Sequence, residues 1–173
     1  MEISKIIELL SYTLPSVVTG LVAYYFFLNH TKNEERKMKL GILRENQKHS
    51  LPIRLQAYER MTLFLERINP SKLLLRVTSV NNDKNAYSHS LINSVEQEFE
   101  HNLAQQIYIS EKCWNVIIAS KNATTHIIMK TAENKSINSA QELREAILKR
   151  MVDSAPPSTT ALAFIKDEVK GFI

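Results

Sequence analysis

The sequence predicts an all-α protein with one N-terminal transmembrane helix, a charged helical stalk and a compact antiparallel bundle of four to five helices. Three observations lead to this prediction. Apolar residues recur every three or four positions through most of the chain. Glycine and proline are scarce, with 3 and 5 copies, whereas β-sandwiches and barrels need them at many turns. Near the N-terminus, twenty consecutive residues carry no charge, which is long enough to cross a bilayer.

The uncharged run covers residues 9–28, LLSYTLPSVVTGLVAYYFFL. As a helix it spans about 30 Å, the thickness of a bilayer core, and in lipid it must be helical to satisfy its backbone polar groups. A cleaved signal peptide would need a basic start and a small-residue cleavage site, and neither is present. A buried core helix would be apolar along one stripe, but this run is apolar nearly all round. We therefore predict a retained anchor.

Charge sets the predicted topology. Residues 29–60 contain eight Lys or Arg against four acids, which equals the net charge of +4 for the whole chain. Basic residues mark the cytoplasmic side of an anchor, so we predict a single-pass protein with its N-terminus outside and its C-terminal domain in the cytoplasm. In a bacterium this location is the inner membrane. The predicted parts are a short extracytoplasmic N-terminus, a transmembrane helix, a charged juxtamembrane stalk and a cytoplasmic helical bundle, over residues 1–8, 9–28, 29–49 and 50–173. Nucleic acid is not an expected partner, because the remaining residues 61–173 are nearly neutral.

Within the bundle, helix boundaries follow from caps and prolines. Ser50 is a candidate cap and Pro52 suits a first turn, so a helix is expected to begin there and to run to Ile68. Its apolar positions at helical spacing, which we expect to face the core, are Ile53, Ala57, Met61, Phe64, Leu65 and Ile68. Residues 72–80 are interpreted as a short helix leading into a loop. Ser110 is expected to cap one helix, and the capping box of residues 139–142 begins another. The remaining helices are predicted from periodicity, which places Leu103 and Ile107 on the apolar face of residues 85–107. Besides the short helix in residues 72–80, the predicted set is 53–68, 85–107, 111–132, 140–151 and 158–170.

The search for chemistry gives weak candidates. Glu98 and His101 form one Glu-x-x-His pair, whereas a di-iron bundle needs two such pairs, so a solvated acidic face is the favoured interpretation. Cys113 is the single cysteine, and a small core residue is the favoured interpretation over a nucleophile. With three glycines in the chain, no phosphate-binding glycine loop can form. We predict no catalytic residue, no metal and no cofactor.

Two surfaces are candidates for protein contacts. In the predicted anchor, Ser16 and Gly20 stand four residues apart, a spacing that lets helices approach closely. In the first bundle helix, polar and aromatic residues of the types enriched at interfaces form a candidate interface, although packing against the stalk is the favoured interpretation. This set is Gln56, Tyr58, Glu59, Arg60 and Arg67.

Residues 51–68, LPIRLQAYERMTLFLERI, and residues 98–122, EFEHNLAQQIYISEKCWNVIIASKN, resemble a family of uncharacterised, membrane-anchored proteins of Bacteroidota. The resemblance implies an inner-membrane location and no mechanism. The leading hypothesis is therefore a membrane-tethered, non-enzymatic module, a scaffold or adaptor that docks another protein or a second copy of itself. The alternatives are an accessory subunit of an inner-membrane transport or secretion complex, and a metal-binding or enzymatic bundle.

Overall fold

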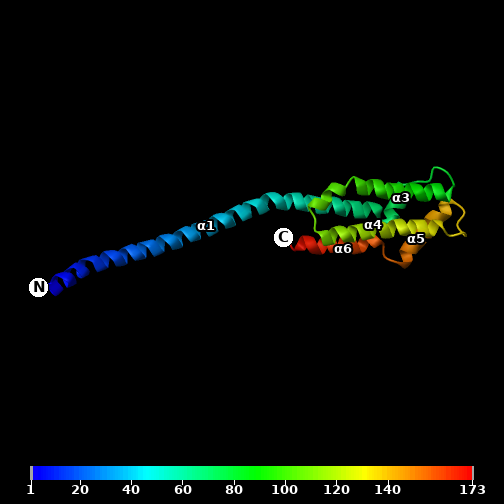
Figure 1. Ribbon diagram of the computed structural model, residues 1–173. Helices are drawn as coiled ribbons and strands as arrows, with labels where there is room; N and C mark the ends of the chain where they lie inside the picture. Colours follow the sequence, from blue (N-terminus) through cyan, green and yellow to red (C-terminus); the bar gives the residue numbers. More distant parts are fainter. Residues whose placement is uncertain (1, 173) are drawn as a thin grey trace. The chain divides into compact units, whose positions relative to one another are not determined.

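The computed structural model describes the backbone of residues 2–172, and the side chains of these residues apart from positions 2, 4, 6, 9, 10, 46 and 47. All regular structure in this range is helical, which confirms the all-α prediction (Figure 1). The chain divides into two compact units, Met1–His49 and Ser50–Ile173. The first two residues of the predicted anchor, Leu9 and Leu10, have side chains outside the described residues.

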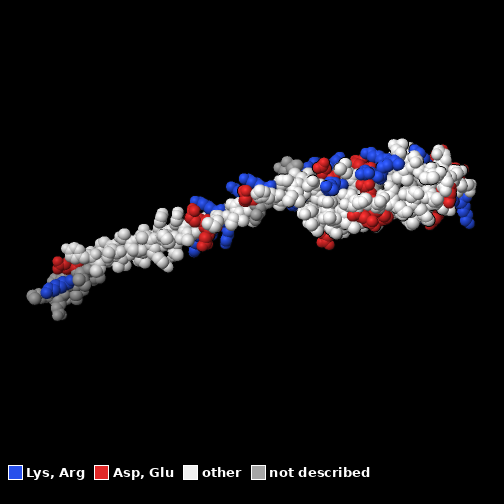
Figure 2. Space-filling model, turned by 90° about the horizontal axis from the view of Figure 1, so that it is seen from above, with Lys and Arg blue, Asp and Glu red and all other residues white. Residues whose placement is uncertain are grey.

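The first unit contains the N-terminal part of α1 (Glu2–Ile68). Every described side chain of residues 11–45 is exposed. Figure 2 shows uncharged surface over the apolar run and then clusters of basic and acidic side chains. By length and composition, α1 is the one helix in the described residues that could cross a membrane.

The prediction of a helix start at Ser50 is wrong, because α1 continues through Pro15, Gly41 and Pro52 without a break. The fixed φ of proline is compatible with a helix, although inside a helix Pro52 removes one backbone hydrogen bond and its ring crowds the carbonyl four residues earlier. The residues before it include good helix formers such as Leu43, Arg44 and Glu45, which favour continuation of the helix through Pro52. Local sequence therefore did not distinguish a new helix from a continued one.

The second unit holds the rest of α1 and six further helical segments. These are α2 (Pro70–Arg76), α3 (Lys84–Glu100), the short 3-10 helix η1 (Leu103–Ile107), α4 (Glu111–Ala132), α5 (Ala140–Asp153) and α6 (Pro157–Lys170). Side-chain caps begin four of them: Asn69, Asp83, Ser110 and Ser139 each accept a backbone N–H of the following helix. Ser110 and Ser139 are capping residues as predicted, and residues 72–80 are the predicted short helix and loop.

One helix ends earlier than predicted. We expected residues 85–107 to be one helix, but α3 ends at Glu100. The side-chain amide of Asn102 donates to the Glu98 carbonyl at 2.8 Å, in the place of the backbone N–H that a continued helix would supply. Beyond it, Leu103 and Ile107 lie in η1 and are 40% and 72% exposed, so they are not the core residues that their spacing suggested.

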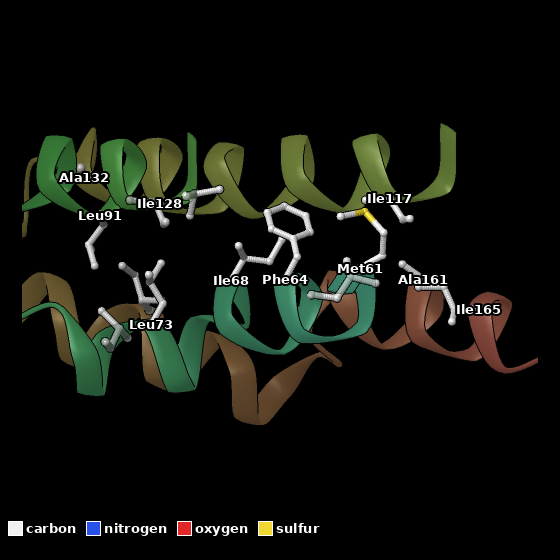
Figure 3. Close-up of a cluster of buried hydrophobic side chains, with 14 of the residues drawn as sticks. Met61, Phe64, Ile68, Leu73, Leu91, Ile117, Ile128, Ala132, Ala161 and Ile165 are labelled. Atoms are coloured by element: carbon white, nitrogen blue, oxygen red, sulfur yellow. The ribbon is translucent and has the colours of Figure 1, made fainter. Parts of the chain in front are cut away.

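The core of the second unit lies between the end of α1 and helices α2 to α6. Figure 3 shows Met61, Phe64 and Ile68 of α1 facing Ile117 and Ile128 of α4, with side chains of α2, α3 and α6 completing the cluster. Aromatic rings extend it, because Phe64 lies 5.7 Å from Phe99 and Phe99 stacks at 5.4 Å on Trp114 (ring centroids). This packing fixes one face of α1 inward and leaves its other residues at the surface.

Candidate functional site

The polar residues predicted as an interface divide between surface and core. Gln56, Glu59, Arg60 and Arg67 are exposed. Tyr58 is only 2% exposed and does not belong to this surface. Helical geometry explains the difference, because Tyr58 lies three residues before Met61 and shares its inward face.

The four exposed residues line one open groove of about 730 Å³, which we call the polar groove. Its second wall comes from α3 and the residues just after it, with Gln97, Glu98 and His101, and Arg76 of α2 also contributes. The sequence could not predict this second wall, because it meets α1 only through tertiary packing. The two weak candidates of the sequence, the polar face of α1 and the Glu98–His101 pair, thus share one site.

Glu98 is the electrostatic centre of the polar groove. Its Oε2 lies 3.2 Å from Nε of Arg67 and 3.4 Å from Nη1 of Arg76, and the Glu98 side chain is 15% exposed. Arg76 also donates to the Arg67 backbone carbonyl at 3.4 Å, which ties α2 to the end of α1. The carboxylate that could have served as a metal ligand is therefore engaged by two guanidinium groups.

The geometry gives no support for a metal site in the described residues, where no group of three or more His, Cys, Asp or Glu side chains is placed to hold an ion. His101 is exposed at the end of α3. By contrast, three long polar side chains in the polar groove, those of Gln56, Arg60 and Gln97, make no hydrogen bond or ion pair within the described residues. Such groups can bind a polar surface brought from outside.

Cys113 is buried, as the favoured interpretation of the sequence predicted. Burial, together with the neighbouring Glu168 carboxylate, raises the pKa of the thiol to about 12. Burial and a hydrogen bond with Glu168 also raise the pKa of Tyr58, whose hydroxyl oxygen accepts the Ser110 N–H at 3.4 Å. A thiol that stays protonated is a poor nucleophile, so this buried cluster is a packing feature.

In the first unit, the predicted helix-pairing residues are exposed. Ser16 donates its hydroxyl to the Thr13 carbonyl at 2.7 Å, and an added methyl group at Gly20 would meet no atom within 4 Å. The surface around them is open enough for another helix to approach. Helix pairing there stays a prediction.

Together these features define a class of protein: an all-helical chain with an exposed apolar N-terminal helix and a packed helical domain that presents a polar groove. Residues 4–172 match the model of a family of unknown function, DUF7935, and the chain belongs to this family. No curated protein and no solved structure matches the chain. This match confirms that the chain resembles a family of uncharacterised proteins. That the family is anchored in membranes and occurs in Bacteroidota stays a prediction.

Proposed function

We propose that this protein is a membrane-tethered, non-enzymatic interaction module: α1 anchors it by residues 9–28, and its helical domain docks another protein at the polar groove. The single observation that carries the docking part is that groove. Residues from α1, α2 and α3 line one open site of about 730 Å³, where a double ion pair holds the walls and unpaired side chains face outward. This arrangement supports binding, because the groove presents several long polar side chains that have no partner within the described residues.

The chemistry of the apolar run supports the tether. Apolar side chains such as Val18, Leu21 and Phe26 are 50% to 71% exposed. The hydroxyls of Ser11, Ser16 and Thr19 each donate to a carbonyl three or four residues earlier in the same helix, at 2.7 Å. Polar groups must be satisfied internally in hydrocarbon, and these hydroxyls need no water.

The location and topology are proposed from charge. With five Lys or Arg in the sixteen residues after Leu28, the domain would lie in the cytoplasm and the N-terminus outside a bacterial inner membrane. The domain itself would be an antiparallel bundle presented by the charged stalk. A tether of this kind confines the domain to two dimensions and raises its effective concentration toward partners in the same membrane.

Site-specific photo-crosslinking in native membranes tests the docking site. A photo-reactive residue at Gln56 or Gln97, on opposite walls of the polar groove, is expected to give crosslinks to the same second protein. The matched control is Asn122, which is exposed on α4 and does not line the groove. Replacing Arg60 by alanine should lower the crosslink yield about fivefold, in line with loss of an interface arginine. Equal products from all three positions, or no reproducible second protein, would count against the proposal.

An accessory subunit of an inner-membrane transport or secretion complex is the second candidate, and the open surface at Gly20 favours it, since a helix of a larger complex could pack there. The double variant Ser16→Leu, Gly20→Leu separates the two. An accessory subunit should lose its complex in blue native gels of mild-detergent extracts, whereas a module that binds through the polar groove should keep its crosslinks.

A further inference from the structure

A second depression lies on the other side of Leu63, between α1 and α6, with a volume of about 510 Å³. Its apolar lining includes Leu55, Leu63 and Val169, and Leu63 is 56% exposed. The buried side chains of Tyr58 and Ile165 form its floor. We call this depression, with its border, the α1/α6 face.

Three charges border the α1/α6 face: Glu59 on α1, and Lys166 and Lys170 on α6. None of the three makes an ion pair or side-chain hydrogen bond within the described residues. Acidic and basic side chains thus lie on opposite borders of an apolar surface, and each still has its full capacity to bind a partner.

The two helices run antiparallel, as a contact at each end shows. Asn69, directly after α1, contacts Ser158 at the start of α6, with Nδ2 and Oγ 3.5 Å apart. At the other end, the rings of Tyr58 and Phe172 lie 5.6 Å apart. Because Phe172 lies beyond the end of α6, the levels are counted from the Asn69–Ser158 contact. At 1.5 Å per residue, this count puts Glu59 midway between the levels of Lys166 and Lys170, about 3 Å along the axis from each.

We propose that the α1/α6 face binds the same face of a second copy of this chain, around a two-fold axis parallel to α1 and α6. Rotation about such an axis keeps every residue at its own level and exchanges the two borders. Glu59 of each copy therefore comes opposite Lys166 and Lys170 of the other, and the apolar strips meet between them. The surface is self-complementary, as an isologous interface requires. A partner helix that carries only acidic side chains would fit less well, because Glu59 would repel it.

This inference deepens the proposed function by naming one partner, and it rests on that function for the membrane setting. Stable dimers of free proteins bury about 1,600 Å² in total. Two copies held in one bilayer need less, since the tether makes their encounter effectively concentrated. The polar groove meets the α1/α6 face at Glu59 and Leu63, which line both. A different protein that binds away from these two residues can still occupy the rest of the polar groove.

The test uses the full chain, labelled with donor or acceptor at the N-terminus and reconstituted in vesicles of phosphatidylethanolamine and phosphatidylglycerol. Energy transfer is measured as lipid is added to dilute the protein in the bilayer. Wild type should exceed the transfer given by random proximity. Glu59→Lys should weaken association about tenfold, because it turns attraction into repulsion at two symmetric places. The triple variant E59K/K166E/K170E should restore it.

The control is Glu133→Lys, the same charge reversal at an exposed acid outside the face, and it should leave energy transfer unchanged. Circular dichroism melts of each variant check folding. Three results would each overturn the proposal. The wild type could show no more energy transfer than random proximity gives, E59K could show the same transfer as the control, or the triple variant could fail to restore it. Transfer lost only with Ser16→Leu, Gly20→Leu would assign self-association to the anchor and overturn it too. The vesicles hold no other protein, so none of these results bears on a different partner at the polar groove.

Discussion

The two halves of α1 share one helix and differ in where their apolar side chains lie. In the first half, Val17, Leu21 and Phe27 are 58%, 62% and 71% exposed. In the second half, Met61, Phe64 and Leu65 are fully buried. Both halves belong to one continuous helix, so the difference lies in what surrounds them. Helices α2 to α6 cover the apolar face of the second half, whereas the described side chains of residues 11–45 are exposed.

The patterns of the two halves match this difference. Residues 57–68 alternate inward apolar and outward polar positions, as a helix at the edge of a core must. Residues 11–28 are apolar on all sides and bond their hydroxyls back to their own carbonyls. A protein core covers one side of a helix, whereas a bilayer covers all sides. The comparison therefore predicts that substitutions in the first half change membrane insertion, whereas substitutions in the second half change the free energy of unfolding.

The largest effect is expected from charge in the first half. Replacing Val18 and Val22 by arginine should cost about 5 to 7 kcal/mol of membrane insertion, at roughly 2.5 to 3.5 kcal/mol for each residue. The chain should move from the carbonate-resistant membrane fraction to the soluble or aggregated fraction. Arginines at Leu40 and Ile42, which are equally exposed but lie in the charged stalk, should leave the fractionation unchanged. If both pairs behaved alike, residues 9–28 would not be an anchor.

The second half should respond to a lost ring instead. Phe64→Ala removes a fully buried ring that contacts Phe99, and should lower the free energy of unfolding by about 3 to 5 kcal/mol. Urea unfolding of the full chain in detergent, followed by tryptophan fluorescence of Trp114, measures the loss. Leu63→Ala, one residue earlier and 56% exposed, should cost less than about 1 kcal/mol. Neither variant should change the membrane fraction, and a destabilised L63A variant would show that Leu63 packs inside the domain.

The sequence was a good guide at several local signals, although the cap and proline at Ser50 and Pro52 wrongly indicated a helix start. The spacing of Ala57, Met61 and Phe64 predicted the buried face of the second half, and caps predicted the starts of α4 and α5. The same spacing included Ile53, which is 48% exposed. Periodicity gives the direction of a side chain but not whether a neighbouring helix reaches that turn.

The candidate site shows the same limit. Four of the five predicted interface residues line the polar groove, but Arg76 and Gln97 were missed. Nothing in the residues around positions 76 and 97 indicates that they face α1, since α2, a loop and α3 must pack before the groove exists. In the same way, the pairing of Glu98 with two arginines removes a carboxylate that looked free in the sequence.

The smallest expected effect concerns the thiol packed against the second half. The folded pKa of Cys113 is about 12, above its ordinary value of 9.0, so the folded state holds the proton more tightly than the unfolded chain does. The contribution of the protonated thiol to the free energy of unfolding is fully present below pH 9 and is lost as the pH rises toward 12. Between pH 9 and 10 the free energy of unfolding should fall by about 1 kcal/mol through this group, at most one proton's worth.

Urea unfolding at pH 9 and 10 measures this fall, and Cys113→Ala is the matched variant, since it removes the thiol but keeps the tyrosines. Burial also raises the pKa values of Tyr58 and Tyr87, so the two tyrosines contribute to the fall in the free energy of unfolding of the wild type. Subtracting the fall measured for Cys113→Ala leaves the part that is due to the thiol. Alkylation of Cys113 at pH 9 should require unfolding, for the same reason. If the free energy of unfolding fell equally in both proteins, and the folded chain were readily alkylated, water would reach the core beside α1. The second half of α1 would then be more hydrated than its packing indicates.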